Sequence, residues 1–220
     1  MRVFALGDPH LPGGKRDRPM HRFGPQWWRH REKILKRSWQ TVRPEDILLL
    51  PGDLSWATKR RDALDDLAFL AQLPGTKICI RGNHDFWWDS DKPIDFPGLL
   101  SPPVRMGDIG FAGTRGCDPS EAPHILERER LRLAKSLEAI QDAPVKIVLL
   151  HHPPQPFADL LNSANVSVCV FGHVHVNSLP EDEAMVLNGE KLGNVVCHCL
   201  PCDRIDFTPR LVHGFPIPVD

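Results

Sequence analysis

The chain has 220 residues, of which 41% are hydrophobic and 25% charged, and its formal net charge is −1. This composition is typical of a folded globular protein and argues against a disordered chain. The near balance of charge gives no overall reason to expect nucleic acid or an anionic membrane as partner. Apolar runs such as Val145–Leu150 are far too short to span a bilayer. We therefore expect a cytoplasmic protein whose six cysteines are reduced.

Predicted strands and helices alternate along the first half of the chain. Short apolar runs bounded by turn residues indicate strands at Arg2–Leu6, Ile47–Leu50 and Thr76–Ile80. Between these strands, Trp27–Val42 and Lys59–Leu73 have the pattern of helices. The apolar stripe expected to face the core in the second helix consists of Ala63, Leu64, Leu67, Leu70 and Ala71.

The second half continues the alternation after an irregular stretch. Phe86–Pro103 contains four prolines and is expected to form a long loop over the sheet edge. The elements predicted next are a strand pair at Val104–Gly113, a helix at Ser120–Gln141 broken near Pro123, and strands at Val145–Leu150 and Val166–Phe171. A hairpin is expected from Ala184–Leu187 and Leu192–Cys199 around a turn at Asn188–Gly189. Because no linker divides this order, we expect one α/β domain over residues 1–220.

Almost every predicted strand is followed by residues whose side chains can bind metal ions. The motifs are Asp8-Pro9-His10, Gly52-Asp53, Gly82-Asn83-His84-Asp85, His151-His152 and Gly172-His173-Val174-His175. Each of these short motifs alone is most simply a turn. The carboxyl ends of strands in an α/β sheet meet at one edge, where ligands bind. Five such motifs in succession therefore indicate one shared site.

The types of ligand in these motifs favour a pair of divalent cations. Carboxylate, imidazole and one neutral amide suit Mn²⁺, Fe²⁺, Zn²⁺ or Ni²⁺ better than Cu⁺ or Ca²⁺. Seven candidate ligands exceed what one tetrahedral ion uses, whereas two ions about 3.5–4 Å apart would use them all. Such a pair binds phosphoryl oxygens and lowers the pKa of bound water. The motifs therefore point to hydrolysis of phosphate esters.

The ordered set Asp-x-His, Gly-Asp, Gly-Asn-His-Asp, His-x-Pro and Gly-His-x-His resembles the calcineurin-like metallophosphoesterase superfamily, between Asp8 and His175. Pro51–Ala57 and Gly82–Trp88 further resemble a small bacterial group of predicted phosphohydrolases. The resemblance implies a two-sheet β-sandwich flanked by helices in four layers. It also implies a binuclear metal-dependent phosphoesterase, with Mn²⁺ as the first choice of metal and Fe, Zn or Ni as others. Such an enzyme hydrolyses phosphodiesters or phosphomonoesters by attack of a metal-bridging hydroxide.

The resemblance also assigns roles to individual residues. The implied ligands are Asp8, His10 and His175 for the first metal, Asp53 as the bridge, and Asn83, His151 and His173 for the second metal. His84 would stabilise the phosphate or protonate the leaving oxygen, and Asp85 would orient the His84 imidazole. His151 is chosen because the family's ligand precedes proline by two positions, which leaves His152 as an outer-sphere group or a surface residue. Ser55 stands where many relatives have an acid and would act only outside the ligand sphere.

One basic segment supports a competing interpretation. Between Lys15 and Arg37 there are nine Lys or Arg residues and two acids, with Trp27 and Trp28 among them. Arginines interleaved with aromatic residues bind single-stranded nucleic acid, so the alternative function is a nucleic-acid-binding module with a vestigial metal site. We favour a helix with a solvated basic face and inward tryptophans. A third interpretation places this segment beside the metal cleft, where its charge draws in an anionic substrate.

Two other groups of residues allow a functional and a structural interpretation. Phe86-Trp87-Trp88 follows His84 and either stacks on an aromatic leaving group or covers the core. Cys197-His198-Cys199 with Cys202 has the composition of a zinc site. Its spacing lacks a second ligand pair, however, and we favour reduced structural thiols near a strand end.

Overall fold

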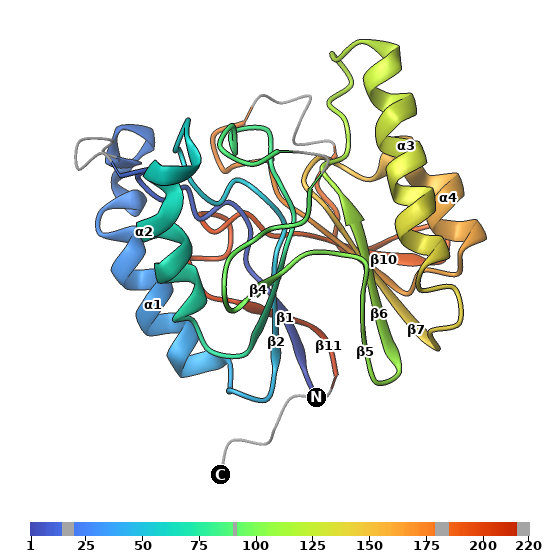
Figure 1. Ribbon diagram of the computed structural model, residues 1–220, viewed down its shortest axis with the longest axis horizontal. Coiled ribbons are helices and arrows are strands. Elements are labelled where there is room, and N and C mark those ends of the chain that lie inside the picture. The colour runs from blue at the N-terminus through green and yellow to red at the C-terminus, as the bar shows by residue number, and fades with distance from the viewer. Residues whose placement is uncertain (15–19, 90–91, 179–184, 215–220) are drawn as a thin grey trace.

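The computed structural model describes residues 1–14, 20–89, 92–178 and 185–214, in which two sheets pack face to face (Figure 1). The five-stranded sheet has the order β11-β1-β2-β3-β4, formed by Arg210–His213, Val3–Ala5, Ile47–Leu50, Thr76–Cys79 and Leu99–Leu100. The six-stranded sheet has the order β5-β6-β7-β8-β10-β9, formed by Val104–Met106, Ile109–Thr114, Val145–Leu150, Val168–Phe171, Val195–Cys199 and Asn188–Leu192.

Helices cover the outer faces of both sheets (Figure 1). The first pair, α1 (His30–Thr41) and α2 (Arg60–Ala71), packs on the five-stranded sheet. The second pair, α3 (Pro123–Glu138) and α4 (Ala158–Ser163), packs on the six-stranded sheet. Short 3₁₀ turns η1, η2 and η3 cover Met20–Phe23, Pro25–Trp27 and Gln155–Phe157. This single domain of two mixed sheets between helices confirms the expected fold class.

Both sheets have a parallel centre, and this arrangement creates the common edge. Strands β1, β2, β3 and β4 run parallel, as do β6, β7, β8 and β10. Strands β11, β5 and β9 are antiparallel to their neighbours at the outside. The chain enters β1 at the lower end of Figure 1, so the loops that follow the parallel strands lie at the upper edge.

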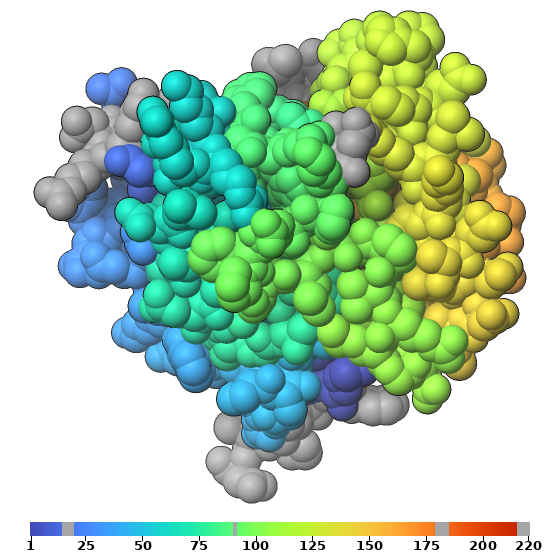
Figure 2. All heavy atoms as spheres, viewed as in Figure 1, coloured from blue at the N-terminus to red at the C-terminus, as the bar shows by residue number. Residues whose placement is uncertain are grey.

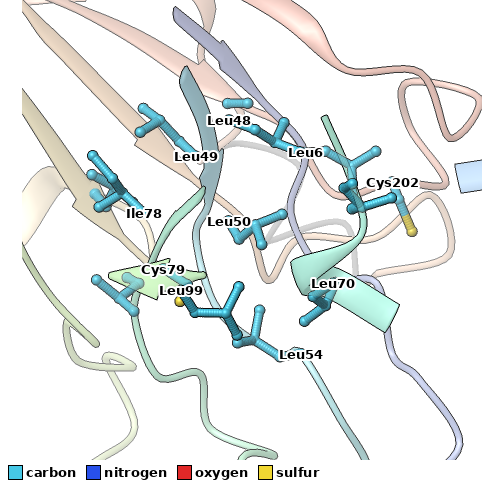
Figure 3. Close-up of a cluster of buried hydrophobic side chains, with 14 of the residues drawn as sticks. Leu6, Leu48, Leu49, Leu50, Leu54, Leu70, Ile78, Cys79, Leu99 and Cys202 are labelled. Carbon is cyan, nitrogen blue, oxygen red and sulfur yellow. The ribbon is translucent and has the colours of Figure 1, made fainter. Parts of the chain in front are cut away.

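The alternation of side chains along each strand builds two apolar layers. In β7, Ile147 and Leu149 point between the sheets, while Val148 and Leu150 point toward α3 and α4. This is the period of two that a strand imposes on its side chains. Figure 3 shows the layer of the five-stranded sheet, in which leucines of β2 pack near Leu6 and Ile78. Truncating one such fully buried leucine to alanine typically costs about 2–5 kcal/mol of stability.

Two of the predicted helices begin later than expected. Helix α1 begins at His30 rather than at Trp27, because Arg29 before it adopts a left-handed conformation (φ 52°). Pro123 does not break a helix but occupies the first turn of α3, where its missing N–H costs nothing.

In α2, Leu64 is exposed, whereas Phe69 is buried in the core. The helical stripe is therefore rotated slightly from the predicted one.

The predicted turn of the last hairpin is wrong. Gly189 lies inside β9, and the turn between β9 and β10 falls at Gly193-Asn194. The side chain of Asn162 on α4 accepts a hydrogen bond from Asn194 N at 2.8 Å and fixes the turn there. Residues 185–187 of the predicted first strand are not in a strand, and Ala184 lies outside the described residues.

The irregular middle segment does cross the sheet edge. Residues 92–106 cover the middle of the face between α2 and α3 (Figure 2). Within it, the two-residue strand β4 pairs with β3 and extends the five-stranded sheet, which the sequence did not predict. Trp87 and Trp88 are both buried, so they cover the core, while Phe86 is exposed. Among the described helices, none is long and apolar enough to cross a membrane.

Candidate metal centre

The metal-capable residues converge at the edge where the parallel strands end. Three groups bring one ligand atom per residue within 4.8 Å of the others. The groups are Asp8 with His10 and His175, Asp8 with Asp53 and His151, and His151 with His152 and His173. Asn83 joins the second group, because its Oδ1 lies 2.5 Å from His151 Nε2. All seven candidate ligands are thus in one place.

Two buried carboxylates lie at the centre of this cluster. Asp53 Oδ2 is 3.7 Å from His10 Nε2 and 3.6 Å from His151 Nε2. It therefore lies between the group that contains His10 and the group that contains His151 and His173. Asp8 Oδ1 is 3.7 Å from His175 Nε2 and 3.9 Å from His151 Nδ1. The loops after strands of both sheets therefore share these two acids.

The backbone at the site is held in an unfavourable conformation. Asp8, His10, Asp53 and His173 have φ angles of 54°, 43°, 52° and 68°. Side-chain-bearing residues rarely adopt the left-handed region, which costs of order 1–3 kcal/mol per residue. Such strain gathers at functional sites, where the surrounding structure holds a side chain in one direction.

Glycines in the motifs allow the neighbouring loops to approach these acids. A Cβ atom on Gly82 would lie 2.1 Å from Asp53 Oδ1, and one on Gly172 would lie 2.1 Å from Asp8 Oδ2. Two backbone donors complete the contacts: His84 N donates to Asp53 Oδ1 at 2.9 Å, and His173 N donates to Asp8 Oδ1 at 3.1 Å. The glycines therefore belong to the motifs for a steric reason.

The imidazoles are oriented by groups behind them. His175 Nδ1 lies 2.9 Å from Asp203 Oδ1, and His151 Nδ1 lies 3.0 Å from the carbonyl oxygen of Pro51. A carboxylate or carbonyl on one ring nitrogen fixes the tautomer, so that the other nitrogen faces a metal. Asp203 is not among the residues predicted for the site. No spacing pattern connects it with His175, 28 residues earlier.

His84 is held at the site by an aromatic neighbour rather than by Asp85. The Trp56 ring centroid lies 4.4 Å from that of His84 and is stacked on His10 at 4.9 Å. The Asp85 carboxylate accepts hydrogen bonds from the backbone amides of residues 54, 55 and 82 and from Trp87 Nε1. Because these donors occupy its oxygens, the predicted orientation of the His84 imidazole by Asp85 is corrected: Asp85 instead fixes the loop backbones.

Two open questions about individual residues are answered by their surroundings. Ser55 lies outside the ligand cluster, where its Oγ donates to the buried Asp66 at 2.6 Å. His152 is not a surface residue: it is buried, with its ring 4.2 Å from that of His173. Neither ring nitrogen of His152 has a hydrogen-bond partner within the described residues. Its place beside His151 and His173 makes it a further candidate contact for an ion or a bound anion.

Electrostatics favour occupation of the site by cations. Burial raises the pKa of Asp8 well above its usual range and also raises that of Asp53. Burial likewise lowers the pKa values of His10 and His151 well below their usual range. The pKa of His175 is raised above its usual value. Burial alone would lower this pKa, but the hydrogen bond to Asp203 and the nearby acids outweigh burial. A divalent cation would stabilise the carboxylates in their charged form and the imidazoles as neutral donors.

The spacing of the donor atoms also fits bound metal ions. His10 Nε2 and His175 Nε2 face one another at 3.1 Å. Metal–ligand bonds of about 2.1 Å place neighbouring ligand atoms about 3 Å apart, so this separation suits two ligands of one ion. The donor set of imidazole, carboxylate and amide oxygen suits borderline divalent ions.

The basic segment borders the site, as one interpretation expected. Met20, Arg22, Phe23 and Trp27 line a cavity of about 380 Å³ that reaches His10. Trp27 is buried, but Trp28 is exposed, so only one of the two tryptophans points inward. Residues 15–19 lie outside the described part of the chain.

The cysteines take no part in the described candidate metal groups. All six are buried, and none forms a disulfide bond. Cys202 Sγ lies 3.0 Å from the backbone oxygen of Asp8 and packs behind the site.

Comparison with models of known protein families shows to which family the chain belongs. The model of the calcineurin-like phosphoesterase family matches residues 1–177, most of the chain. The chain belongs to the calcineurin-like phosphoesterase family. Membership implies metal-dependent hydrolysis of phosphoesters, and the geometry above supplies candidate His and Asp ligands for the metal.

The chain is also similar to individual proteins. An uncharacterized metallophosphoesterase of Aquifex aeolicus is 25% identical over 185 residues, which cover 78% of this chain and 68% of the relative. The crystal structure of phosphopantetheinyl hydrolase from Mycobacterium tuberculosis has a TM-score of 0.56 at 15% identity, covering 100% of this chain and 98% of that one. This likeness shows a shared fold. A protein of unknown function from Aquifex aeolicus has a TM-score of 0.49 at 18% identity, covering 96% and 95%.

Proposed function

We propose that this calcineurin-like phosphoesterase hydrolyses phosphate esters, phosphodiesters in the first place, with two divalent cations. The observation that carries the proposal is the position of Asp53 between two ligand groups, 3.7 Å from His10 Nε2 and 3.6 Å from His151 Nε2. A carboxylate in this position suits a bridge between two ions about 3.5–4 Å apart.

The ligand groups divide into two sets around this bridge. The proposed ligands are Asp8, His10 and His175 for one ion, Asn83, His151 and His173 for the other, and Asp53 for both. His151 is preferred to His152 because its Nε2 faces Asn83 and Asp53 while its Nδ1 is engaged by a backbone carbonyl. Mn²⁺ is the proposed metal, and Fe, Zn or Ni would suit the same donors.

Bound metal ions would polarise the phosphoryl oxygens and supply water of lowered pKa as the nucleophile. His84 supports the reaction from the protein side. Its main chain is tied to Asp53, and its ring packs on Trp56, so the imidazole has a fixed place beside the ligands. Burial lowers the pKa of His84 and keeps the ring neutral at pH 7. In this neutral form its N–H donates a hydrogen bond to the phosphoryl group, whereas protonation of the leaving oxygen requires the imidazolium form of the ring.

Asp85 acts as a positioning residue. It holds the backbone of residues 54–55 against Gly82, and these residues flank the proposed ligands Asp53 and Asn83. Removing this carboxylate would free both loops at once. Its effect on catalysis therefore passes through the direction of the ligands rather than through contact with substrate.

Hydrolysis of bis(p-nitrophenyl) phosphate with Mn²⁺ tests the proposal. We expect both Asp53→Asn and His84→Ala to lower turnover at least about a hundredfold, because one removes the bridging charge and the other the donor at the phosphate. His124→Ala is the matched control, since His124 is exposed at the beginning of α3. Full activity in both site variants would contradict the proposed mechanism. Absence of turnover in the wild-type protein with every divalent ion would contradict the proposed function.

A further inference from the structure

A cavity of about 380 Å³ adjoins the candidate metal centre on the side of His10 and His175. Its remaining lining comes largely from the segment that follows the first metal motif. Met20, Phe23 and Trp27 from that segment contribute apolar walls, and Trp56 adds a further aromatic wall. A site of this size with apolar walls lies at the lower end of the range for small-molecule pockets.

The walls of this cavity are held in place by contacts between them. The Trp56 indole Nε1 lies 3.2 Å from Met20 Sδ, and the Asn177 side-chain amide donates to the backbone oxygen of Phe23 at 3.2 Å. The second contact links the turn at 20–23 to the loop that carries His175. The cavity is therefore formed before a ligand enters, which reduces the entropy lost on binding.

The position of His84 indicates which part of a substrate the cavity receives. His84 lines the cavity together with His10 and His175. Where His84 acts on the leaving oxygen, the second of the two roles proposed above, the group attached to that oxygen extends past His84 into the cavity. Asn177 and Ser178 offer polar atoms on the same wall, and Arg22 adds a positive charge.

We propose that this cavity is the subsite for the alcohol released from the phosphoester, and that this alcohol carries a flat aromatic ring. Phe23 is the specificity residue, since the residue is 58% exposed while Trp27 is almost fully buried. Hydrolysis then joins a water oxygen to phosphorus and breaks the bond to the alcohol oxygen, which leaves with a proton. The inference rests on the proposed function.

Two phosphodiesters that differ only in the ring test the inference. The first is the methyl ester of adenosine 5′-phosphate, and the second has a methoxy group in place of the base. We expect kcat/KM with Mn²⁺ to be at least about tenfold higher for the first, the lower part of the range for stacking of a base on aromatic side chains. The products of the first are expected to be adenosine and methyl phosphate. Release of methanol and adenosine 5′-phosphate instead would overturn the inference.

Variants of the exposed aromatic residues localise the effect. Phe23→Ala is expected to reduce the preference for the ring-bearing diester at least threefold, and Phe23→Leu, which keeps apolar bulk, to reduce it as well. Trp28→Ala is the matched control, because Trp28 is similarly exposed on the same segment but does not line the cavity. It is expected to keep both rates. An equal preference in all variants would contradict the role of Phe23.

A binding measurement separates this inference from the proposed function. Adenosine is titrated into the protein without added metal, and quenching of the protein's tryptophan fluorescence, to which Trp27 and Trp56 in the cavity wall contribute, reports occupation of the cavity. We expect saturable quenching in the wild-type protein and at least threefold weaker binding in Phe23→Ala. If the two diesters are hydrolysed equally and adenosine does not bind, the inference fails while the hydrolase stands. If no ester is hydrolysed with any ion, the proposed function itself fails.

Discussion

The two halves of the sandwich bring different chemistry to the same edge. The loops after the five-stranded sheet carry both central carboxylates and the amide, with Asp8, His10, Asp53, Asn83 and His84. The loops after the six-stranded sheet carry the imidazoles of His151, His152, His173 and His175, with the Asp203 carboxylate behind His175. Neither half contains a complete metal site, so packing of the two sheets is what creates it.

This difference predicts in which half of the site a substitution lowers activity most. Burial raises the pKa values of Asp8 and Asp53, because a charged carboxylate is costly without a cation beside it. Burial of the imidazoles of His10 and His151 merely keeps them neutral, which is the form that binds a metal. Loss of an acid from the five-stranded half should therefore do more damage than loss of orientation in the other half.

The largest effect is expected for Asp53→Asn. The amide keeps the shape of the side chain but removes the negative charge between the two ligand groups. We expect activity on phosphodiesters to fall by at least about a thousandfold, together with a loss of bound metal. Steady-state kinetics with metal analysis of the purified variant measures both. Retention of two bound ions and of activity would remove Asp53 from the bridging role.

The next largest effect is expected for His84→Ala. This variant separates catalysis from metal binding in the half built by the five-stranded sheet. Loss of a positioned proton donor typically lowers kcat by about 10²–10⁴-fold. Because His84 is not a proposed ligand, we expect metal content to stay at the wild-type value. A matching fall in metal content would show that His84 serves the ligand cluster instead.

A smaller effect is expected for Asp203→Asn, which acts on the imidazole half. Asp203 lies 2.9 Å from His175 Nδ1 and fixes the direction of that ring. Loss of such an outer partner typically costs about 10–100-fold in metal affinity or activity. Metal titration followed by calorimetry measures the change, with the exposed Asp206→Asn as control. Equal affinity in both variants would show that the hydrogen bond does not orient His175.

The smallest effect on activity is expected for Asp46→Asn. Asp46 lies in the five-stranded half but away from the site. Burial alone would raise the pKa of Asp46, but hydrogen bonds from Arg2 and from the Arg43 amide hold it below its usual range. Its stabilising contribution is therefore present above pH 4 and is lost as pH falls through the folded pKa. We expect the variant to lose about 1.5–3 kcal/mol in urea unfolding at pH 7, with a smaller difference at pH 3. A pH-independent difference would contradict this ionic contribution.

The convergence of the site could be predicted from the sequence for a simple geometric reason. Parallel strands end at one edge, so residues that directly follow them, such as Asp8, Asp53 and His151, come together whatever the details of the loops. The fold class followed from the same alternation and from the ordered motifs. Local patterns were sufficient where a short strand alone decides the position of a residue.

Contacts between distant segments could not be predicted in this way. Asp203 reaches His175 from a turn beyond β10, and no local pattern marks it. Asp85 meets amides from another loop instead of the neighbouring imidazole. The hairpin turn moved to Gly193 because Asn162, about 30 residues earlier, holds it there. In each case the deciding partner lies on another element, and its identity depends on packing.

The most direct test of the two-ion centre is anomalous diffraction from crystals grown with Mn²⁺. We expect two anomalous peaks about 3.5–4 Å apart at the shared edge of the sheets, with the Asp53 carboxylate in contact with both. The His10 and His175 rings would contact one peak, and Asn83 with His151 would contact the other. A single peak, or peaks away from Asp53, would contradict the account.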